Sequence, residues 1–140
     1  MFKFTTLYYR VDDEDKLEAF FSKTHLPLAE QLPALVKSEV SRIKGKPGGE
    51  SRFHMAYSLY FATEESYQLS MLSDVGVKLV QALLPWEEAR LITWYYADVF
   101  EEIVKDARPK LTAADLLPPG FTKGSEESAH SSSADDAAGM

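Results

Sequence analysis

Large, mostly apolar side chains recur at every second position over residues 53–61. Phe, Met, Tyr, Leu and Phe occupy every second position, and His, Ala, Ser and Tyr lie between them. This period of two is that of a β-strand with two unlike faces, because a helix would scatter the large side chains around its axis. We therefore predict a strand over Phe53–Phe61.

Three further segments are rich in β-branched and aromatic residues, which favour strands. They are Phe2–Val11, Leu35–Lys44 and Arg90–Phe100. The last segment has large apolar residues at both alternating sets of positions, so both of its faces are predicted to be covered. Residues 45–49, with three glycines and a proline, predict a turn between the second and third strands.

The first helical region lies between the first two strands. Its apolar stripe at positions i, i+3, i+4 and i+7 consists of Leu17, Phe20, Phe21 and Thr24. Asp12 is predicted to cap the helix. Pro27 suits the first turn of a renewed short helix, so we expect the helix to bend near His25.

The second helical region, after the alternating strand, is predicted to form two pieces. Thr63 is an N-cap followed by two glutamates, and carboxylates stabilise a helix N-terminus. Ser73 offers a second N-cap, and Gly76 weakens continuity before the helical spacing resumes.

The resulting order, βαββαβ, is that of the ferredoxin-like fold, an α+β architecture with a four-stranded antiparallel sheet. Two helices cover only one face of such a sheet. The other face, including part of the strand with Trp94 and Tyr95, would be an apolar patch of a kind that soluble proteins rarely expose. We therefore predict a homodimer packed sheet to sheet, in which a second copy covers this face.

Composition restricts the class of protein and of partner. A length of 140 residues suits one domain, and 15 Lys and Arg residues against 22 Asp and Glu residues give a net charge of −7. This charge would repel a phosphate backbone, so nucleic acid is not expected as a partner. The absence of cysteine excludes thiolate chemistry and fits a cytoplasmic location. No apolar run is long enough for a membrane span.

The composition changes after about Phe121. Residues 122–140 are rich in Ser, Ala, Gly, Asp and Glu, and such a segment cannot bury enough surface to offset its ordering entropy. We predict a ferredoxin-like domain over residues 1–100, an arm over 101–121 that covers the partner subunit, and a disordered acidic tail over 122–140. A tail that folds on a binding partner is the alternative.

Three motifs resemble those of the EthD-like proteins. The sequence HLPLAEQLPAL over His25–Leu35 is similar to their H-x-P-L-x-x-x-L-P-G-L signature. Leu59–Phe61, before an acidic helix start, resembles their strand ending L-W-F, and Ser73–Gly76 resembles their S-P-E-G break. The similarity extends over about residues 2–99.

This chain departs from these motifs at Ala34, which replaces the glycine, at Tyr60, which replaces the tryptophan, and at Asp74, which replaces the proline. The resemblance implies a dimeric α+β barrel, in which the sheets of two ferredoxin-like protomers close against each other. It also implies no cofactor, because relatives in that superfamily include cofactor-free monooxygenases, lactone isomerases and polyketide cyclases. These relatives bind small aromatic or carbonyl compounds between sheet and helices.

His25 is the first candidate for catalysis. It is the histidine of the resemblance, and an imidazole at the end of a helix would be poised near neutral pH as a general base. Its target would be a carbon or hydroxyl next to a carbonyl. The alternative is a structural histidine that binds the last free carbonyls of the helix and stabilises its bend.

The alternating strand supplies further candidates. Its period predicts that His54, Ser58 and Tyr60 share one face and line one wall of a cavity. Tyr60 would donate its phenol to a ligand carbonyl and assist enolate formation. The alternatives are a solvated His54 at the strand end and a Tyr60 that packs in the core. Tyr8 and Trp94 are predicted to touch the ligand, with sheet packing as their alternative role.

Other chemistries are not supported by the sequence. No set of ligands at metal-binding spacing accompanies the histidines, Ser58 lies on a strand rather than a nucleophile elbow, and no glycine-rich phosphate loop follows a strand. We therefore expect a protein that binds a small hydrophobic or aromatic carbonyl compound. It would be either a cofactor-free isomerase, cyclase or monooxygenase using general base catalysis, or a non-catalytic accessory protein of a degradation or biosynthetic pathway.

Overall fold

The computed structural model describes residues 1–104. The elements are β1 (Phe2–Tyr9), α1 (Glu14–Phe20), the π-helical turn η1 (Phe21–His25), α2 (Leu26–Glu30), β2 (Leu35–Arg42), β3 (Phe53–Phe61), α3 (Glu64–Met71), α4 (Asp74–Glu88) and β4 (Ile92–Asp98). Their order confirms the predicted α+β, ferredoxin-like fold. The predicted tail over residues 122–140 and most of the predicted arm over 101–121 lie outside the described residues.

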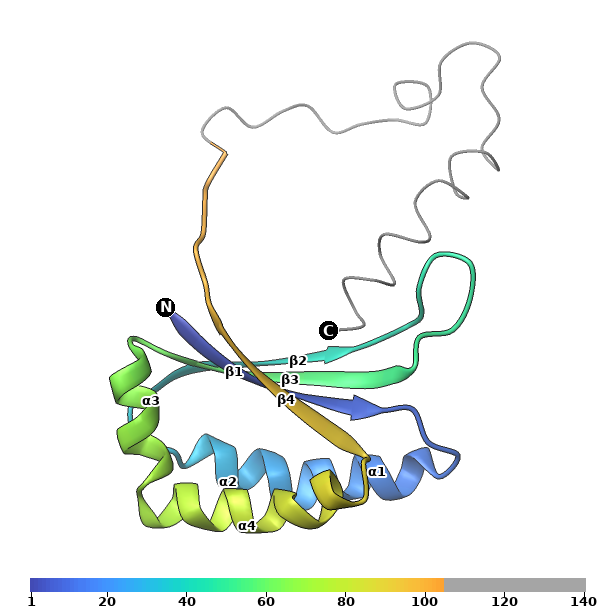
Figure 1. The fold of residues 1–140 in the computed structure, drawn as a ribbon, viewed down its shortest axis with the longest axis horizontal. Helices are drawn as coiled ribbons and strands as arrows, with labels where there is room; N and C mark the ends of the chain where they lie inside the picture. The colour runs from blue at the N-terminus through green and yellow to red at the C-terminus, as the bar shows by residue number, and fades with distance from the viewer. Residues whose placement is uncertain (105–140) are drawn as a thin grey trace. The chain divides into compact units, whose positions relative to one another are not determined.

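All four strands form one antiparallel sheet in the order β2-β3-β1-β4. Helices α1, α2 and α4 lie against one face of this sheet, as Figure 1 shows. No helix within residues 1–104 lies on the opposite face, which we call the far face. Side chains of the far face include Lys3, Thr5, Ser58, Tyr60 and Tyr95, because they alternate with the residues that point to the helices.

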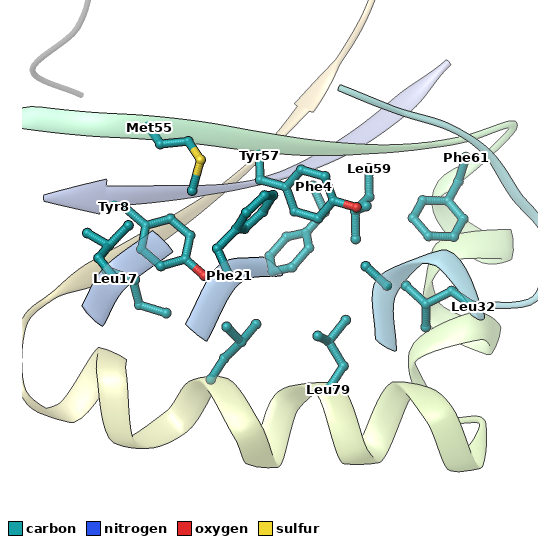
Figure 2. Packing of buried hydrophobic residues seen from close by; sticks show 13 residues of the cluster. Phe4, Tyr8, Leu17, Phe21, Leu32, Met55, Tyr57, Leu59, Phe61 and Leu79 are labelled. Atoms are coloured by element: carbon teal, nitrogen blue, oxygen red, sulfur yellow. The ribbon is translucent and has the colours of Figure 1, made fainter. Parts of the chain in front are cut away.

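The core lies between the sheet and the helices, and most of its members are labelled in Figure 2. Its buried residues are Phe4, Tyr8, Leu17, Phe21, Ala29, Leu32, Met55, Tyr57, Leu59, Phe61, Leu79, Leu83 and Ile92. Burying one large apolar side chain contributes about 1.5–3 kcal/mol relative to exposure. The large residues of the predicted alternation supply four of these members, from Met55 to Phe61. Hydrophobic burial therefore fixes which face of β3 meets the helices.

The first helical region is continuous through a π-helical turn. Its N-cap is Asp13, rather than the predicted Asp12, and the Asp13 carboxylate accepts a hydrogen bond from the Lys16 backbone N–H over 3.0 Å. The turn η1 is closed by the Leu26 N–H, which donates to the carbonyl of Phe21. A π turn inserts one residue into a helix and so rotates the residues that follow. The irregularity expected near His25 is therefore this turn rather than an interruption.

The second helical region has the two predicted pieces. Thr63 Oγ1 accepts from Ser66 N over 3.1 Å at the start of α3, and Ser73 Oγ accepts from Gly76 N over 3.1 Å at the start of α4. Gly76 is buried, and a Cβ atom at this position would lie 2.5 Å from the carbonyl oxygens of Ser70 and Met71. The glycine thus permits the close approach between the two helices.

Strand β4 lies at an edge of the sheet and is shorter than predicted. Ile92 is buried, whereas Tyr95 is 37% exposed and Tyr96 is 62% exposed. Within a single chain the strand is therefore covered at Ile92 and less so at Tyr95 and Tyr96, and the prediction that both of its faces are covered, which includes a second copy, stays a prediction. An edge strand has a neighbour on one side only, so its side chains have fewer atoms around them than those of a central strand.

No helix within residues 1–104 is both long enough and apolar enough to cross a membrane.

Candidate functional site

His25 lies in the core, with 1% of its surface exposed. A hydrogen bond of 2.5 Å joins its Nδ1 to the hydroxyl of Tyr8, and the ring of Tyr57 packs edge-on against the imidazole at 4.9 Å between centroids. Burial lowers the pKa of His25 to about 3, so the imidazole is uncharged at neutral pH. Its Nδ1 thus binds a phenol rather than the helix carbonyls that the structural alternative requires.

Two buried phenols flank this imidazole. Burial raises the pKa of Tyr8 above its usual range, with smaller contributions from Tyr57 and Glu18. Burial also raises the pKa of Tyr57, and the nearby Ser38 hydroxyl partly offsets that rise. The Tyr57 hydroxyl forms no hydrogen bond of good geometry within the described part of the chain. At neutral pH His25, Tyr8 and Tyr57 are therefore all uncharged. The hydroxyl of Tyr57 is the one group among them that is free to bind a partner.

His54 does not share a face with Ser58 and Tyr60, so that prediction is wrong. The pairing of β1 with β3 shifts register between Tyr8 and Tyr9, and Tyr9 lies opposite Phe53 instead of His54. A bulge adds one residue to a strand and redirects the side chains next to it. His54 therefore reaches helix α1, where its Nε2 lies 2.7 Å from Glu18 Oε2.

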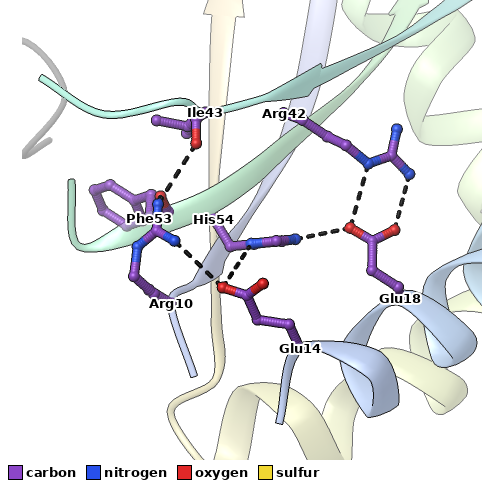
Figure 3. Close-up of polar contacts among 7 residues, drawn as sticks. All are labelled: Arg10, Glu14, Glu18, Arg42, Ile43, Phe53 and His54. Carbon is purple, nitrogen blue, oxygen red and sulfur yellow. Dashed lines mark hydrogen bonds and ion pairs between the residues drawn. The ribbon is translucent and has the colours of Figure 1, made fainter. Parts of the chain in front are cut away.

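The His54 side chain is part of a charged cluster that ties α1 to the sheet, as Figure 3 shows. Arg42 Nε and Nη2 donate to the two carboxylate oxygens of Glu18 over 3.2 and 2.8 Å, and this pairing lowers the pKa of Glu18. Glu14 Oε1 lies 3.3 Å from Arg10 Nη1 and 3.8 Å from His54 Nδ1. These groups balance one another's charge, and within residues 1–104 no cluster of His, Asp or Glu is arranged to hold a metal ion.

Ser58 and Tyr60 lie on the far face, where both hydroxyls have protein partners. Ser58 Oγ lies 2.7 Å from Thr5 Oγ1, and the Tyr60 hydroxyl donates to Glu39 Oε1 over 3.1 Å. Burial, together with Glu39, raises the pKa of Tyr60. Because His25 is on the helix side of the sheet, the structure does not bring Tyr60 or Ser58 together with it.

Trp94 lines a cavity of about 410 Å³ between the sheet and helices α3 and α4. The lining residues are Phe4, Tyr67, Met71, Val80, Leu83, Trp94, Tyr95 and Tyr96, and we call this space the Trp94 cavity. The indole Nε1 of Trp94 is buried and has no hydrogen-bond partner among the described residues. A buried donor without a partner costs about 1–3 kcal/mol, so an acceptor atom brought within hydrogen-bond distance of Nε1 would be stabilised.

Aromatic rings form most of one wall of the Trp94 cavity. The Tyr67 ring lies 5.4 Å from that of Phe4 and 5.5 Å from that of Tyr96, and the Trp94 ring lies 6.2 Å from that of Phe4. Burial raises the pKa of Tyr67, and a hydrogen bond with Tyr96 adds to this rise. No charged side chain is among the lining residues.

The structure places Trp94 at this cavity together with Tyr67 and Tyr96, which were not among the predicted pocket residues, and its contact with a ligand stays a prediction. Tyr8 lies beside His25, and Ser58 lies on the other side of the sheet. The sequence does contain an indication for Tyr96: it lies two positions after Trp94 on the same strand, so the two side chains share a face. Tyr67 has no comparable signal, because its approach to β1 depends on how α3 packs.

Comparisons with known proteins support the resemblance that the motifs indicate. A crystal structure of an ethyl tert-butyl ether degradation (EthD) family protein from Bacillus halodurans is 29% identical to this chain, with a TM-score of 0.67, and the match covers 71% of this chain and 99% of that one. The resemblance to the EthD family is confirmed. No protein-family model matches this EthD-like chain, and no curated protein does.

Two more distant structures show the same fold as the EthD-like chain. SnoaB, a cofactor-independent oxygenase from Streptomyces nogalater, is 9% identical with a TM-score of 0.52, and the match covers 75% of this chain and 97% of SnoaB. A dimeric ferredoxin-like protein of unknown function from Jannaschia is 13% identical with a TM-score of 0.53, over 71% of this chain and all of that one. Identities this low bear on the fold alone.

Proposed function

We propose that this protein binds a small, uncharged hydrophobic or aromatic carbonyl compound in the Trp94 cavity. The observation that carries the proposal is Trp94, which lines a space of about 410 Å³ and whose buried Nε1 has no hydrogen-bond partner within residues 1–104. Ligand sites typically occupy roughly 300–1,000 Å³, with apolar walls and a few polar groups that fix orientation. A carbonyl oxygen would accept from Nε1 and remove the cost of the unpaired donor.

The walls of the cavity select for this class of compound. The rings of Phe4, Tyr67 and Tyr96 offer flat surfaces to an aromatic ligand, and such contacts add to the free energy gained from burial. A charged ligand would lose its hydration with no opposite charge in the lining to compensate.

We also propose that two copies of this chain pack through their far faces. Two observations support this: no helix within residues 1–104 covers the far face, and a protein of the same fold is described as dimeric. A cytoplasmic location suits the chain, since it contains no cysteine that would require an oxidising compartment.

A second candidate function is cofactor-free proton transfer by His25, of the kind needed by an isomerase, cyclase or monooxygenase. The observation in its favour is the hydrogen bond of 2.5 Å to Tyr8 beside the unpartnered hydroxyl of Tyr57. An uncharged imidazole is the form that accepts a proton. Binding without turnover ranks first, because His25 is not among the residues that line the Trp94 cavity.

The test uses 2-acetylnaphthalene and its carbonyl-free analogue 2-ethylnaphthalene as probes. Dissociation constants would be measured by following the indole N–H signal of Trp94 in proton–nitrogen correlation spectra. Trp94→Phe should weaken binding of 2-acetylnaphthalene about fivefold to tenfold, measured on backbone signals around the cavity, and leave 2-ethylnaphthalene nearly unchanged. Trp86→Phe is the matched control and should change neither affinity.

Equal weakening of both probes by Trp94→Phe would show that the indole acts by packing and not as a hydrogen-bond donor. Absence of any shift at Trp94 with both probes would refute binding at this cavity.

A further inference from the structure

A second cavity, of about 300 Å³, lies near the C-terminal end of α4. It is lined by Val11, Asp13, Lys16, Leu17, Pro85, Trp86 and Leu91, and we call it the Trp86 cavity. It shares no lining residue with the Trp94 cavity. Any ligand that it holds would therefore be recognised by different groups.

The C-terminal turn of α4 builds one wall of this cavity. Arg90 has a left-handed φ of 60°, and the Leu91 N–H donates to the carbonyl of Trp86 over 2.9 Å. This six-to-one hydrogen bond is that of a Schellman motif, which places the residue after the left-handed one against the last turn of the helix. Leu91 and Trp86 are brought to the same wall by the backbone.

Packing holds the Trp86 ring in place. It stacks on Phe20 at 4.4 Å between centroids and meets the edge of Tyr8 at 6.0 Å. Leu17, which is fully buried, completes an apolar floor. The cavity therefore offers a fixed, largely apolar surface to a ring-shaped ligand.

Two charged residues, Asp13 and Lys16, line the cavity, and they differ in whether a ligand could bind their charged groups. The Asp13 carboxylate already accepts the N-cap hydrogen bond from the Lys16 backbone N–H. The Lys16 ammonium has no ion pair or hydrogen bond with any residue in the part of the chain that the structure describes. A ligand with an anionic group would gain a charge-assisted contact at Lys16.

We propose that the Trp86 cavity is a separate binding site for a small aromatic or alicyclic carboxylate. The ring would lie against Trp86, Leu17 and Leu91, and the carboxylate would accept from Lys16 Nζ. This class differs from the uncharged compound assigned to the Trp94 cavity, so the two sites do not depend on each other.

The chain contains two tryptophans, and each lines one of the two cavities. Titration of the full chain with 2-naphthoate, followed on the two indole N–H signals, therefore reports on the sites separately. The Trp86 signal should shift and saturate while the Trp94 signal stays in place. The signals would be assigned with Trp86→Phe.

Lys16→Gln should weaken 2-naphthoate about fivefold, and raised salt should reduce the affinity of the unchanged chain in the same direction. Lys23→Gln, at an exposed lysine outside the cavity, is the matched control and should leave the affinity within about twofold. The uncharged probe 2-naphthamide should bind more weakly than 2-naphthoate and be insensitive to Lys16→Gln.

The proposal is overturned if 2-naphthoate leaves the Trp86 signal unmoved, or if the two lysine variants lose affinity equally. Tighter binding of 2-naphthylmethylamine would also overturn it, because an ammonium ligand would identify Asp13 as the recognition group. None of these results bears on the uncharged probes used for the Trp94 cavity.

Discussion

Ala34 and Arg90 both adopt left-handed backbone conformations, with φ of 65° and 60°. A residue with a Cβ atom is strained there, by about 1–2 kcal/mol, whereas glycine is not. The signature that the first helical region resembles has glycine where this chain has Ala34, and the positive φ gives the physical reason for that glycine.

Ala34→Gly should accordingly raise the free energy of unfolding, by about 0.5–1 kcal/mol, because relief of strain exceeds the entropy that glycine gains in the unfolded chain. Urea denaturation would measure the change. Ala19→Gly, in helix α1, is the control and should lower stability by about 1 kcal/mol. A loss of stability in Ala34→Gly would contradict the strain.

The buried His25 predicts an acid-sensitive fold. Its pKa is about 3 in the folded chain against an ordinary value of 6.5, so the unfolded chain binds the proton first as the pH falls. Above pH 6.5 the uncharged His25 makes its full contribution to the free energy of unfolding. Between pH 6.5 and pH 3 that free energy falls by about 1.4 kcal/mol per pH unit.

Urea denaturation at pH 7, 6 and 5 would test this. His25→Gln should show a markedly smaller loss between pH 6.5 and 5, although its stability at pH 7 is lower because Tyr8 loses its partner. The contribution of Glu18 to stability is also lost in acid, but only from about pH 4.5 downward, because its pKa is lowered from that ordinary value in the folded chain. Parallel pH profiles for the two proteins would rule out His25 as the titrating group.

Among the elements, the junction between α3 and α4 is the most sensitive to added volume. Gly76→Ala would place a methyl group 2.5 Å from two backbone carbonyl oxygens, so the helices must separate. We expect a loss of about 2 kcal/mol or more in the free energy of unfolding.

Gly49→Ala is a matched substitution, because nothing lies within 4 Å of a Cβ atom at Gly49. It should change stability by less than about 0.5 kcal/mol. Thermal or urea denaturation of both variants gives the comparison, and a tolerated Gly76→Ala would mean that the junction is looser than its geometry indicates.

The pairing of the strands also explains why the predicted position of His54 was wrong. Strict alternation would have placed it beside Ser58 and Tyr60, but the register shift between β1 and β3 turns it toward Glu18. Bulges arise from the pairing of two distant segments, and nothing within residues 53–61 marks one.

For the whole molecule, the proposed dimer has a direct test. Light scattering at micromolar concentration should give a mass near twice 15.7 kDa. Thr93→Arg, on the far face opposite Leu7, should shift the mass toward that of one chain, because a charge would be buried between the sheets.

Gln81→Arg adds the same charge on the exposed surface of α4 and should leave the mass unchanged. A monomer mass for the unchanged chain would refute the dimer without affecting either cavity, since both are lined by residues of a single chain.

The sequence by itself determined the order of strands and helices, the helix caps at Thr63 and Ser73, and the buried face of β3 from Met55 to Phe61. These features depend on neighbours within a few residues, and their periods are visible in the chain. The assignment of Trp94 to a ligand pocket stays a prediction from the sequence, and the structure places this residue at a cavity.

Only the tertiary structure decided which side chains meet. It placed His25 against Tyr8 across 17 positions of the chain, set Tyr60 on the opposite side of the sheet, and left two cavities at different places along α4. Such contacts depend on the packing of segments that are far apart in sequence, where one bulge or one π turn redirects a side chain. Local periodicity contains no record of those shifts, so the candidate site could be located only from the packing of the folded chain.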